Sequence, residues 1–222
     1  VVALGLKRLQ KTKNLGMATL IGRCQLADKP LSAYHIGFVL GPCFNASGRL
    51  DTAVRGIELL EEKEPGRAAA LAQELQTLNE ERKVMTETGV EEAVSWIERE
   101  HAQEDAVLVI YLPDLHESLA GIVAGRIRER YYRPTLVLTD AREGVKGSGR
   151  SIPEYSMYEK LSQCSDLLTR FGGHPMAAGF SLERENISAF RRRLNELADL
   201  TPEDLTEKIM IDVPMPLSCL RP

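Results

Sequence analysis

Midway along the chain stands the stretch Ala106-Val107-Leu108-Val109-Ile110-Tyr111-Leu112, a continuous run of apolar side chains. Such a run is typical of a strand that is buried on both faces of a sheet. A helical pattern over residues 119–131 follows it, and a second apolar strand pattern covers residues 134–139. This alternation of strand and helix predicts an α/β domain.

The alternation continues toward the C-terminus. Residues 144–151 predict a third strand, residues 177–182 a further strand, and residues 187–197 a helix. Ser156 and Glu159 have the spacing of a capping box, which predicts another helix start between the strands.

The N-terminal part predicts helices. Apolar spacing indicates helices over residues 1–11, 16–21 and 32–40, and Gly41-Pro42 is expected to end the last of them. Asp51 is expected to cap the next helix. The apolar face of that helix is expected to consist of Ala53, Ile57 and Leu60.

A long helical pattern runs over residues 65–100 and is interrupted near Gly89. Its apolar stripe is thin, and the rest of its surface is mostly Glu, Gln, Lys and Arg. Such a helix is typical of a connection between two domains. We therefore place the domain boundary within it.

The composition is that of an ordinary globular chain, with 43% hydrophobic and 27% charged residues. No apolar run approaches the ~20 residues that cross a bilayer, so we expect no membrane partner. The four cysteines include no Cys-x-x-Cys pair, which favours free thiols in the cytoplasm over a zinc site. A net charge of −4 hides a basic stretch in the first 30 residues, so a basic surface remains compatible with the composition.

Three short segments combine glycines with polar or cationic side chains. Glycine lets a ligand approach the main chain closely, and the planar fork of arginine matches phosphate oxygens. Each segment alone is equally well explained as a tight turn, but three in one chain favour a surface that binds a polyanion. The segments are Phe171–Phe180, Lys146–Ser151 and Gly41–Leu50.

We assign polar side chains of these segments to substrate phosphates and two glycines to backbone donation. The phosphate set is Arg49, Ser148, Arg150, Ser151 and His174, and the backbone donors are Gly172 and Gly173. Asn45 and His116 complete the candidate set, although Asn45 could instead brace its own loop and His116 a helix start. Tyr155 and Tyr158 could stack on bases, but core packing is the favoured interpretation.

Four motifs together resemble the RecJ family of single-strand-specific DNA exonucleases, within the DHH phosphoesterase superfamily. Gly172–Gly179 is similar to the signature of the DHH-associated domain, and Asn45-Ala46-Ser47-Gly48-Arg49 is similar to the RecJ-type Asn-Ala-x-Gly-Arg motif. His116–Arg126 is similar to the family's His-x-Gly-Val-x-Gly-Ile-Val-Ala-x-Arg helix start. Gly147-Ser148-Gly149-Arg150-Ser151 matches Gly-Ser-x-Arg-Ser. The motifs occur in the family's order.

The resemblance implies an α/β fold in which a C-terminal α/β DHH-associated domain is joined by a long helix to a helical remnant of the DHH domain. The implied division has four parts. They are the helical end of the DHH catalytic domain (1–64), the linking helix (65–100), the DHH-associated substrate-binding domain (101–200) and the start of an OB-type domain (201–222), whose first strand would be 208–213.

The resemblance also implies hydrolysis of single-stranded DNA from its 5′ end, with Mn²⁺ or Mg²⁺ as cofactor and a single-strand-binding protein as a candidate partner. Some of the phosphate-binding residues would grip the 5′-terminal phosphate. Ser118 stands where the family usually has glycine, and Cys43 where a basic residue is frequent. The Asp-His-His motif that names the superfamily does not occur in the sequence. We therefore expect this chain to hold substrate and to be inactive alone.

Three alternatives stay open from the sequence. The first is an oligoribonucleotide or cyclic-dinucleotide phosphodiesterase of the same superfamily, against which the Asn45–Arg49 motif argues. The second is a nucleic-acid-binding module without hydrolytic activity. The third is an editing domain attached to a synthetase, in which the Ser148–Ser151 segment is less expected.

Overall fold

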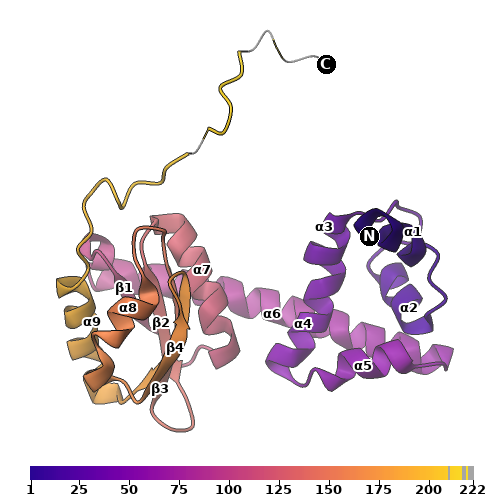
Figure 1. Cartoon of the computed structure of the whole chain (residues 1–222). Coiled ribbons are helices and arrows are strands. Elements are labelled where there is room, and N and C mark those ends of the chain that lie inside the picture. The colour runs from indigo at the N-terminus through magenta and orange to yellow at the C-terminus, as the bar shows by residue number, and fades with distance from the viewer. Residues whose placement is uncertain (210, 217–218, 220–222) are drawn as a thin grey trace. The chain divides into compact units, whose positions relative to one another are not determined.

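The structure is a computed structural model, and it describes residues 1–209, 211–216 and 219. The chain divides into two units (Figure 1). The first unit consists of Val1–Glu92 and Leu115–Val123, and the second consists of Ala93–Asp114 and the described residues from Ala124 onward. Each unit has its own hydrophobic core, and each is described by itself.

The first unit is helical, as the sequence predicts. Its elements are α1 (Val2–Leu9), α2 (Leu15–Arg23), α3 (Ala33–His35), the π-helix η1 (Ile36–Leu40), α4 (Gly41–Leu50), α5 (Val54–Glu61) and the first part of α6 (Pro65–Arg99), with the short 3₁₀-helix η3 (Glu117–Leu119). Asn14 caps α2, because its side chain accepts a hydrogen bond from Met17 N (2.9 Å). Leucines from α2, α5 and α6 form much of the hydrophobic core of this unit.

The prediction that Gly41-Pro42 ends a helix is wrong. The chain continues from η1 directly into α4, so the Asn45–Arg49 motif is helical and not a loop. The wide turn of the π-helix gives the physical reason: Gly41 N–H donates to the Ile36 carbonyl, and Pro42 then falls in the first turn of α4. A proline in a first helical turn loses no intrahelical hydrogen bond.

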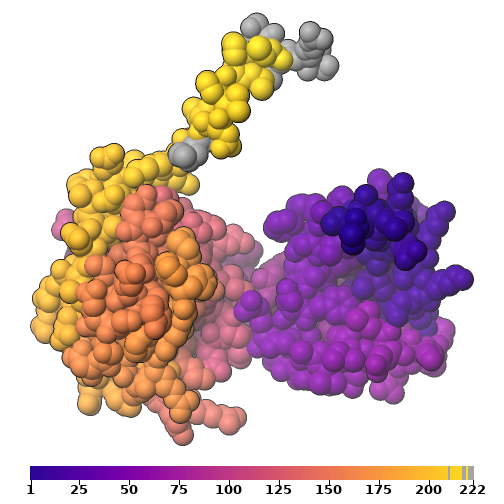
Figure 2. Space-filling model, viewed as in Figure 1, coloured from indigo at the N-terminus to yellow at the C-terminus, as the bar shows by residue number. Residues whose placement is uncertain are grey.

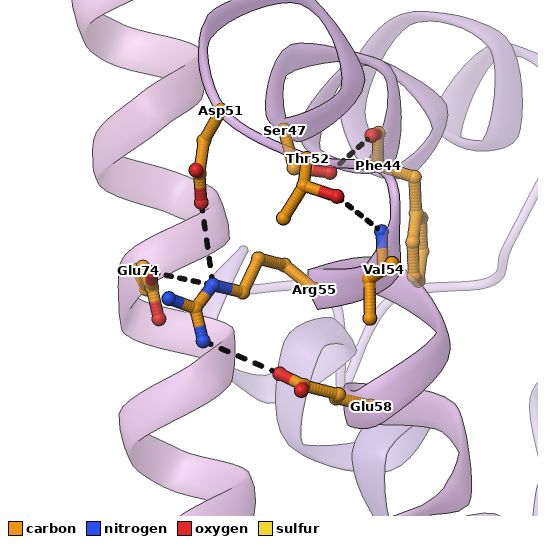
Figure 3. A network of polar contacts seen from close by, with 8 residues as sticks. All are labelled: Phe44, Ser47, Asp51, Thr52, Val54, Arg55, Glu58 and Glu74. Carbon is orange, nitrogen blue, oxygen red and sulfur yellow. Dashed lines mark hydrogen bonds and ion pairs between the residues drawn. The ribbon is translucent and has the colours of Figure 1, made fainter.

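The predicted cap of the next helix is also wrong. Asp51 ends α4 instead, and α5 begins after Ala53 without a side-chain cap. Figure 3 shows the role that Asp51 takes: its carboxylate lies 3.3 Å from Arg55 Nε, and the same guanidinium also contacts Glu58 (3.3 Å) and Glu74 (3.2 Å). This ion cluster ties the turn after α4 to α5 and α6.

The buried face of α5 differs from the predicted one. Ile57 and Leu60 are exposed (55% and 39%), whereas Gly56 and Leu59 are buried. The difference arises because α5 packs through a close backbone approach to α2 at Gly16 and Leu59, which the apolar spacing alone does not reveal.

The long helix α6 is continuous over its 35 residues, so the predicted interruption near Gly89 is wrong. The absence of a side chain at Gly89 makes room for neighbouring side chains and does not bend the helix. A Cβ atom there would lie 2.8 Å from Leu115 Cδ1 and 3.2 Å from Val123 Cγ2, both side chains of the first unit. The division between the two units falls within α6, after Glu92.

The second unit contains a five-stranded sheet with the order β1-β2-β3-β5-β4. Its strands are β1 (Leu108–Tyr111), β2 (Thr135–Asp140), β3 (Val145–Arg150), β4 (Arg170–His174) and β5 (Ala177–Leu182). The first pair is parallel and the other pairs are antiparallel. The helix α7 (Ala120–Tyr131) lies between β1 and β2 in the chain, as a parallel crossover requires.

Two further helices and three short 3₁₀-helices complete the regular structure of this unit. They are α8 (Met157–Ser162), α9 (Ile187–Glu196), η2 (Ala102–Glu104), η4 (Ser165–Leu167) and η5 (Arg184–Asn186). The predicted strands and helices between residues 106 and 197 are confirmed. The sequence did not predict β4, because two of its five residues are glycines, which are infrequent in strands.

The core of the second unit lies between the sheet and the helices α8 and α9. Phe180 of β5 and Phe190 of α9 meet there, with ring centroids 5.2 Å apart. Tyr155 is 1% exposed in this core, which confirms core packing over base stacking for that ring, whereas Tyr158 is 44% exposed. The predicted helix start is confirmed, since Ser156 is the N-cap of α8, but the capping-box hydrogen bonds are not formed, because the buried Ser156 Oγ has no hydrogen-bond partner among the described residues.

The predicted strand at residues 208–213 is not found among its described members, and Met210 lies outside the described residues. In the described part of the chain, no helix combines the length and the apolarity that crossing a bilayer would need.

Two glycines of α2 offer a matched test of the packing between α2 and α5. A Cβ atom on Gly16 would lie 1.7 Å from the Leu59 carbonyl oxygen, whereas one on Gly22 would meet nothing within 4 Å. Gly16→Ala should therefore lower the free energy of unfolding by about 1–3 kcal/mol through overpacking. Gly22→Ala should raise it by roughly 0.5–1 kcal/mol, as alanine replaces glycine in a helix. Urea unfolding of both variants measures the difference, and equal effects would contradict the close approach.

Candidate phosphate-binding surfaces

One face of the sheet collects most of the polar residues that the sequence singles out. The registers pair Arg150 with Ala177 and Ala177 with His174 across β3, β5 and β4. Cross-strand partners share a face, and residues two apart in a strand share it as well. This face therefore carries nine positions in three rows. They are Arg150, Ala177 and His174; Ser148, Gly179 and Gly172; and Lys146, Ser181 and Arg170.

The chemistry of these nine positions is cationic and sterically open. Three of the nine are lysine or arginine, one is histidine, two are serine, and none is a carboxylate. Lys146, Arg170, Gly172, His174 and Gly179 are exposed. Strands lie about 4.8 Å apart, so β3 and β4 side chains frame a strip roughly 10 Å wide over β5. In the space-filling view, the segment that carries α8, β4 and β5 forms a continuous orange surface of the second unit (Figure 2).

The opposite face of β3 and β5 is apolar and buried. Val145, Ala178, Phe180 and Leu182 alternate with the cationic set and are buried in the core. Because side chains alternate along each strand, the apolar residues lie on the core side of the sheet and the cationic residues lie on the other side.

Gly172 and Gly173 are strand residues and not members of the predicted loop, and they differ from each other. Gly173 has φ +152°, and a Cβ atom there would lie 2.4 Å from the Ala177 carbonyl oxygen and 2.6 Å from Ala178 Cα. A Cβ atom on Gly172 would meet nothing within 4 Å. Gly173 is thus required by the hairpin, whereas Gly172 leaves open space on the cationic face.

His174 ends β4, and its ring is oriented by the turn that follows. Its Nδ1 accepts a hydrogen bond from Met176 N (3.3 Å), so in the neutral ring the proton is on Nε2. The turn itself is held from both sides, because Ser151 N donates to the Met176 carbonyl (2.9 Å) and Met157 N to the Pro175 carbonyl (2.9 Å). His174 therefore presents an N–H donor from a fixed hairpin end.

The three predicted residues of β3 and its end have different surroundings. Arg150 Nη1 donates to Ser148 Oγ (3.2 Å) and to the Gly149 carbonyl (2.8 Å), which holds the two side chains together on the cationic face. Ser151, in contrast, is 1% exposed, and its hydroxyl donates to the Tyr155 carbonyl (2.5 Å). This is a correction to the predicted set, since the Ser151 side chain stabilises a turn and is not accessible to a ligand.

A second, smaller group lies in the first unit and is centred on Ser118. Arg49 Nη1 donates to the Ser118 carbonyl (2.8 Å), and His116 Nδ1 lies 2.8 Å from Ser118 Oγ. His116 is the N-cap of η3, which confirms the helix-start interpretation of this residue. Arg49 and His116 are both exposed. Asn45 is exposed on α4, and its side chain forms no hydrogen bond to other described residues, so the bracing interpretation gains no support.

The structure thus brings the predicted residues together in two groups. Ser148, Arg150, Gly172 and His174 share one sheet face of the second unit, and Arg49 and His116 meet through Ser118 in the first. Sequence reasoning missed Arg170 and did not place Lys146 in the candidate set. Both stand two residues from a predicted member on the same strand, so the period of two would have revealed them once β4 was recognised.

The described residues contain no group of three His, Cys, Asp or Glu side chains that could hold a metal ion. They therefore do not fit a divalent-metal centre, and the chemistry available on these surfaces is the binding of anions by cations and N–H donors.

The fold and these surfaces define a class of protein. Residues 104–199 match the model of the DHHA1 domain, which coincides with the second unit's sheet and its helices. The chain is 39% identical over 215 residues to the single-stranded-DNA-specific exonuclease RecJ of Bacillus subtilis, and 36% identical over 222 residues to that of Escherichia coli. These matches cover 96% and 95% of the chain.

Solved structures give the same result. RecJ from Thermus thermophilus in complex with Mn²⁺ superposes with a TM-score of 0.79 and 31% identity, over 90% of this chain and 29% of that one. An exonuclease RecJ bound to manganese gives a TM-score of 0.78 and 30% identity, over 90% of this chain and 49% of the other. The chain is thus similar to RecJ exonucleases over nearly its whole length, and it contains a DHHA1 domain. It spans 27% of the length of the Bacillus subtilis relative and 38% of that from Escherichia coli.

The two adjacent glycines of β4 allow a matched test of the surface. Gly173→Ala should lower the free energy of unfolding by about 1–3 kcal/mol, because the hairpin backbone must move to admit the methyl group. Gly172→Ala should change it by less than about 1 kcal/mol, since alanine fits there without a contact. Thermal and urea unfolding of the two variants check the prediction. A Gly172 variant as unstable as the Gly173 variant would show that the face is packed rather than open.

Proposed function

We propose that this chain is the substrate-binding part of a single-strand-specific DNA exonuclease, and that the cationic face of β3, β5 and β4 holds phosphates of the DNA backbone. The observation that carries the proposal is the register of these strands, which gives one sheet face without a carboxylate. On it Lys146, Arg170 and His174 are exposed, and Ser148 and Arg150 are half-buried. A surface of this kind suits the regularly spaced charges of a single strand.

Each residue has a definite part in this proposal. Arg150 and Arg170, from strands on either side of β5, would each offer a planar set of N–H donors to phosphate oxygens. Ser148 Oγ and His174 Nε2 would add two further hydrogen-bond donors. The edge position of β4 leaves alternate main-chain N–H groups directed away from β5, as the proposed backbone donation by the Gly172–Gly173 segment needs.

The centre of this face is open and carries no carboxylate, and this affects which ligands it can bind. Gly172 and Gly179 pair with each other and leave the β4 and β5 positions of the middle row without side chains, so a nucleic-acid backbone can approach the sheet closely there. The contacts are to phosphate and not to base edges, so we expect binding that is tolerant of sequence. Arg49 and His116 of the first unit, with Asn45, form a second proposed contact with the same kind of ligand.

The relatives' structures were determined with Mg²⁺ or Mn²⁺, and we propose that the full protein uses such an ion. The ion would neutralise phosphate charge and activate a water molecule. We assign no residue of this chain to that step, because the described residues do not form a metal group. The cytoplasm and a single-strand-binding protein remain the proposed compartment and partner, the former consistent with four free cysteines.

Arg170 gives the direct test of the proposal. Arg170→Ala should weaken binding of a 5′-phosphorylated, fluorescently labelled oligonucleotide by roughly tenfold, since a charge-assisted hydrogen bond contributes about 1.5 kcal/mol. It should also reduce the slope of log K against log salt by about 0.7, the value for one phosphate contact on a single strand. Fluorescence anisotropy over a salt series measures both quantities.

Arg192→Ala is the matched control, because it removes the same charge from an exposed side chain of α9 that pairs with Glu196. It should leave the affinity and the salt slope essentially as in the wild type. Equal losses in the two variants would show that the chain responds to net charge alone, and the proposed face would then be rejected.

His174 tests whether an N–H donor at the end of β4 contributes to binding. His174→Ala should weaken binding of the same oligonucleotide about fivefold to tenfold, the effect of one hydrogen bond of about 1 kcal/mol. His174→Gln should recover most of this loss, because the Gln amide nitrogen can take the place of Nε2. If Gln and Ala bind equally weakly while both melt like the wild type, the Nε2–H donor plays no part.

A further inference from the structure

Two of the chain's cysteines meet in one small pocket of the first unit. Cys24 is the C-cap of α2 and is partly exposed, and Cys43 lies in the first turn of α4 and is 2% exposed. Both line a pocket of about 340 Å³. The ionisable residues that line it with them are Arg23, Glu80 and Lys83. The sequence separates the two cysteines, and the packing of α2 against α4 and α6 brings them together.

The two thiols line the same small pocket, and each alters the pKa of the other. The neighbouring Cys43 thiol is the main reason that the pKa of Cys24 is lowered to about 7, with Arg23 and Lys83 adding to the effect and burial and Glu80 opposing it. The Cys24 thiol is likewise the main reason that the pKa of Cys43 is raised well above that of a free thiol, and burial raises it further. The environment thus favours the thiolate at the accessible Cys24 and the protonated thiol at the enclosed Cys43.

The surroundings fix this arrangement. Cys43 Sγ donates to the Val39 carbonyl (3.3 Å), which directs its side chain. Arg23 is held in turn by α6, where its Nε donates to Gln76 Oε1 (3.2 Å) and its Nη2 to Gln73 Oε1. The pocket therefore contains an accessible thiol, two cations that favour its thiolate form, and a second thiol that lines the same pocket.

We propose that Cys24 and Cys43 form a reversible disulfide when the protein meets a peroxide, with Cys24 as the attacking thiol and Cys43 as the resolving one. The Cys24 thiolate attacks one peroxide oxygen, the O–O bond breaks, and Cys24 becomes a sulfenic acid while hydroxide leaves. Cys43 sulfur then attacks the sulfenic sulfur, the S–O bond breaks, and a second hydroxide leaves. The Cys43 proton and one solvent proton convert both hydroxides to water, so two thiols lose two electrons to one peroxide.

The order of attack follows from the two environments. Cys24 has access to solvent and thiolate character, whereas Cys43 is enclosed. Once Cys24 is oxidised its negative charge is gone, and the cause that chiefly holds the proton on Cys43 disappears with it. The proposal concerns these two thiols alone and does not depend on the proposed function.

Mass spectrometry after peroxide treatment tests the proposal. Trypsin does not cut between Lys29 and Pro30, so residues 24–49 leave as one peptide that contains both cysteines. After hydrogen peroxide and quenching with iodoacetamide, this peptide should be unalkylated and lighter by two hydrogen atoms. Dithiothreitol should restore two alkylatable thiols. The experiment uses the chain with Cys219→Ser, which removes an exposed thiol able to link two chains.

Two variants and one internal control complete the test. Cys43→Ala should leave Cys24 as a sulfenic acid that dimedone traps, and it should raise the pH of half-maximal Cys24 alkylation from about 7 toward that of an ordinary thiol. Cys24→Ser should leave Cys43 unoxidised. Cys164 is buried, and its pKa is raised to about 11 by burial, so it should stay reduced throughout.

Two results would overturn the proposal. One is a peptide 24–49 that keeps two alkylatable thiols when peroxide has already oxidised other residues. The other is a Cys24 that proceeds to sulfinic acid while Cys43 stays reduced. Melting temperatures of the reduced variants, measured in parallel, separate a chemical result from unfolding.

Discussion

The antiparallel pairing of β3, β5 and β4 is the constraint on which the second unit depends. Because side chains alternate across a strand, one register decides both faces at once. Val145, Ala178 and Phe180 enter the core, and Ser148, Arg150 and His174 emerge on the other side. A slip of one residue would bury the cations and expose the core, so the stability of the unit and its proposed binding surface are specified by the same interaction.

In the first unit, close helix packing has the role that the strand register has in the second unit: it decides which side chains lie next to one another. The approach of Gly16 to Leu59 positions α5 against α2, and the Arg55 cluster ties the turn after α4 to α5 and α6. Arg49 at the end of α4 is thereby directed to the Ser118 carbonyl. The same packing brings Cys24 and Cys43 to one pocket. Cys43 stands at the position where the RecJ-like motif often has a basic residue. A change in one helix contact would therefore alter both the Arg49 group and the thiol pair.

The elements of the α/β unit could be predicted from local pattern, because a buried strand such as residues 106–112 and an amphipathic helix such as α9 carry their periodicity in adjacent residues. The errors fall where a tertiary contact overrides the local signal. Gly41-Pro42 does not stop a helix, since the π-helical turn before it supplies the needed geometry. Gly89 does not interrupt α6, since its missing side chain accommodates Leu115 and Val123.

The sequence by itself determined the family motifs, the fold class and the residue types of a phosphate-binding surface, because glycine, arginine and histidine at short spacings keep their chemistry in any fold. Only the tertiary structure decided which of them act together. The cross-strand register places Arg150, His174 and Arg170 on one face of the sheet. Ser151 is buried and therefore does not belong to the proposed phosphate-binding surface. Helix packing pairs Cys24 with Cys43. These relations join residues distant in the chain, and no local spacing encodes them.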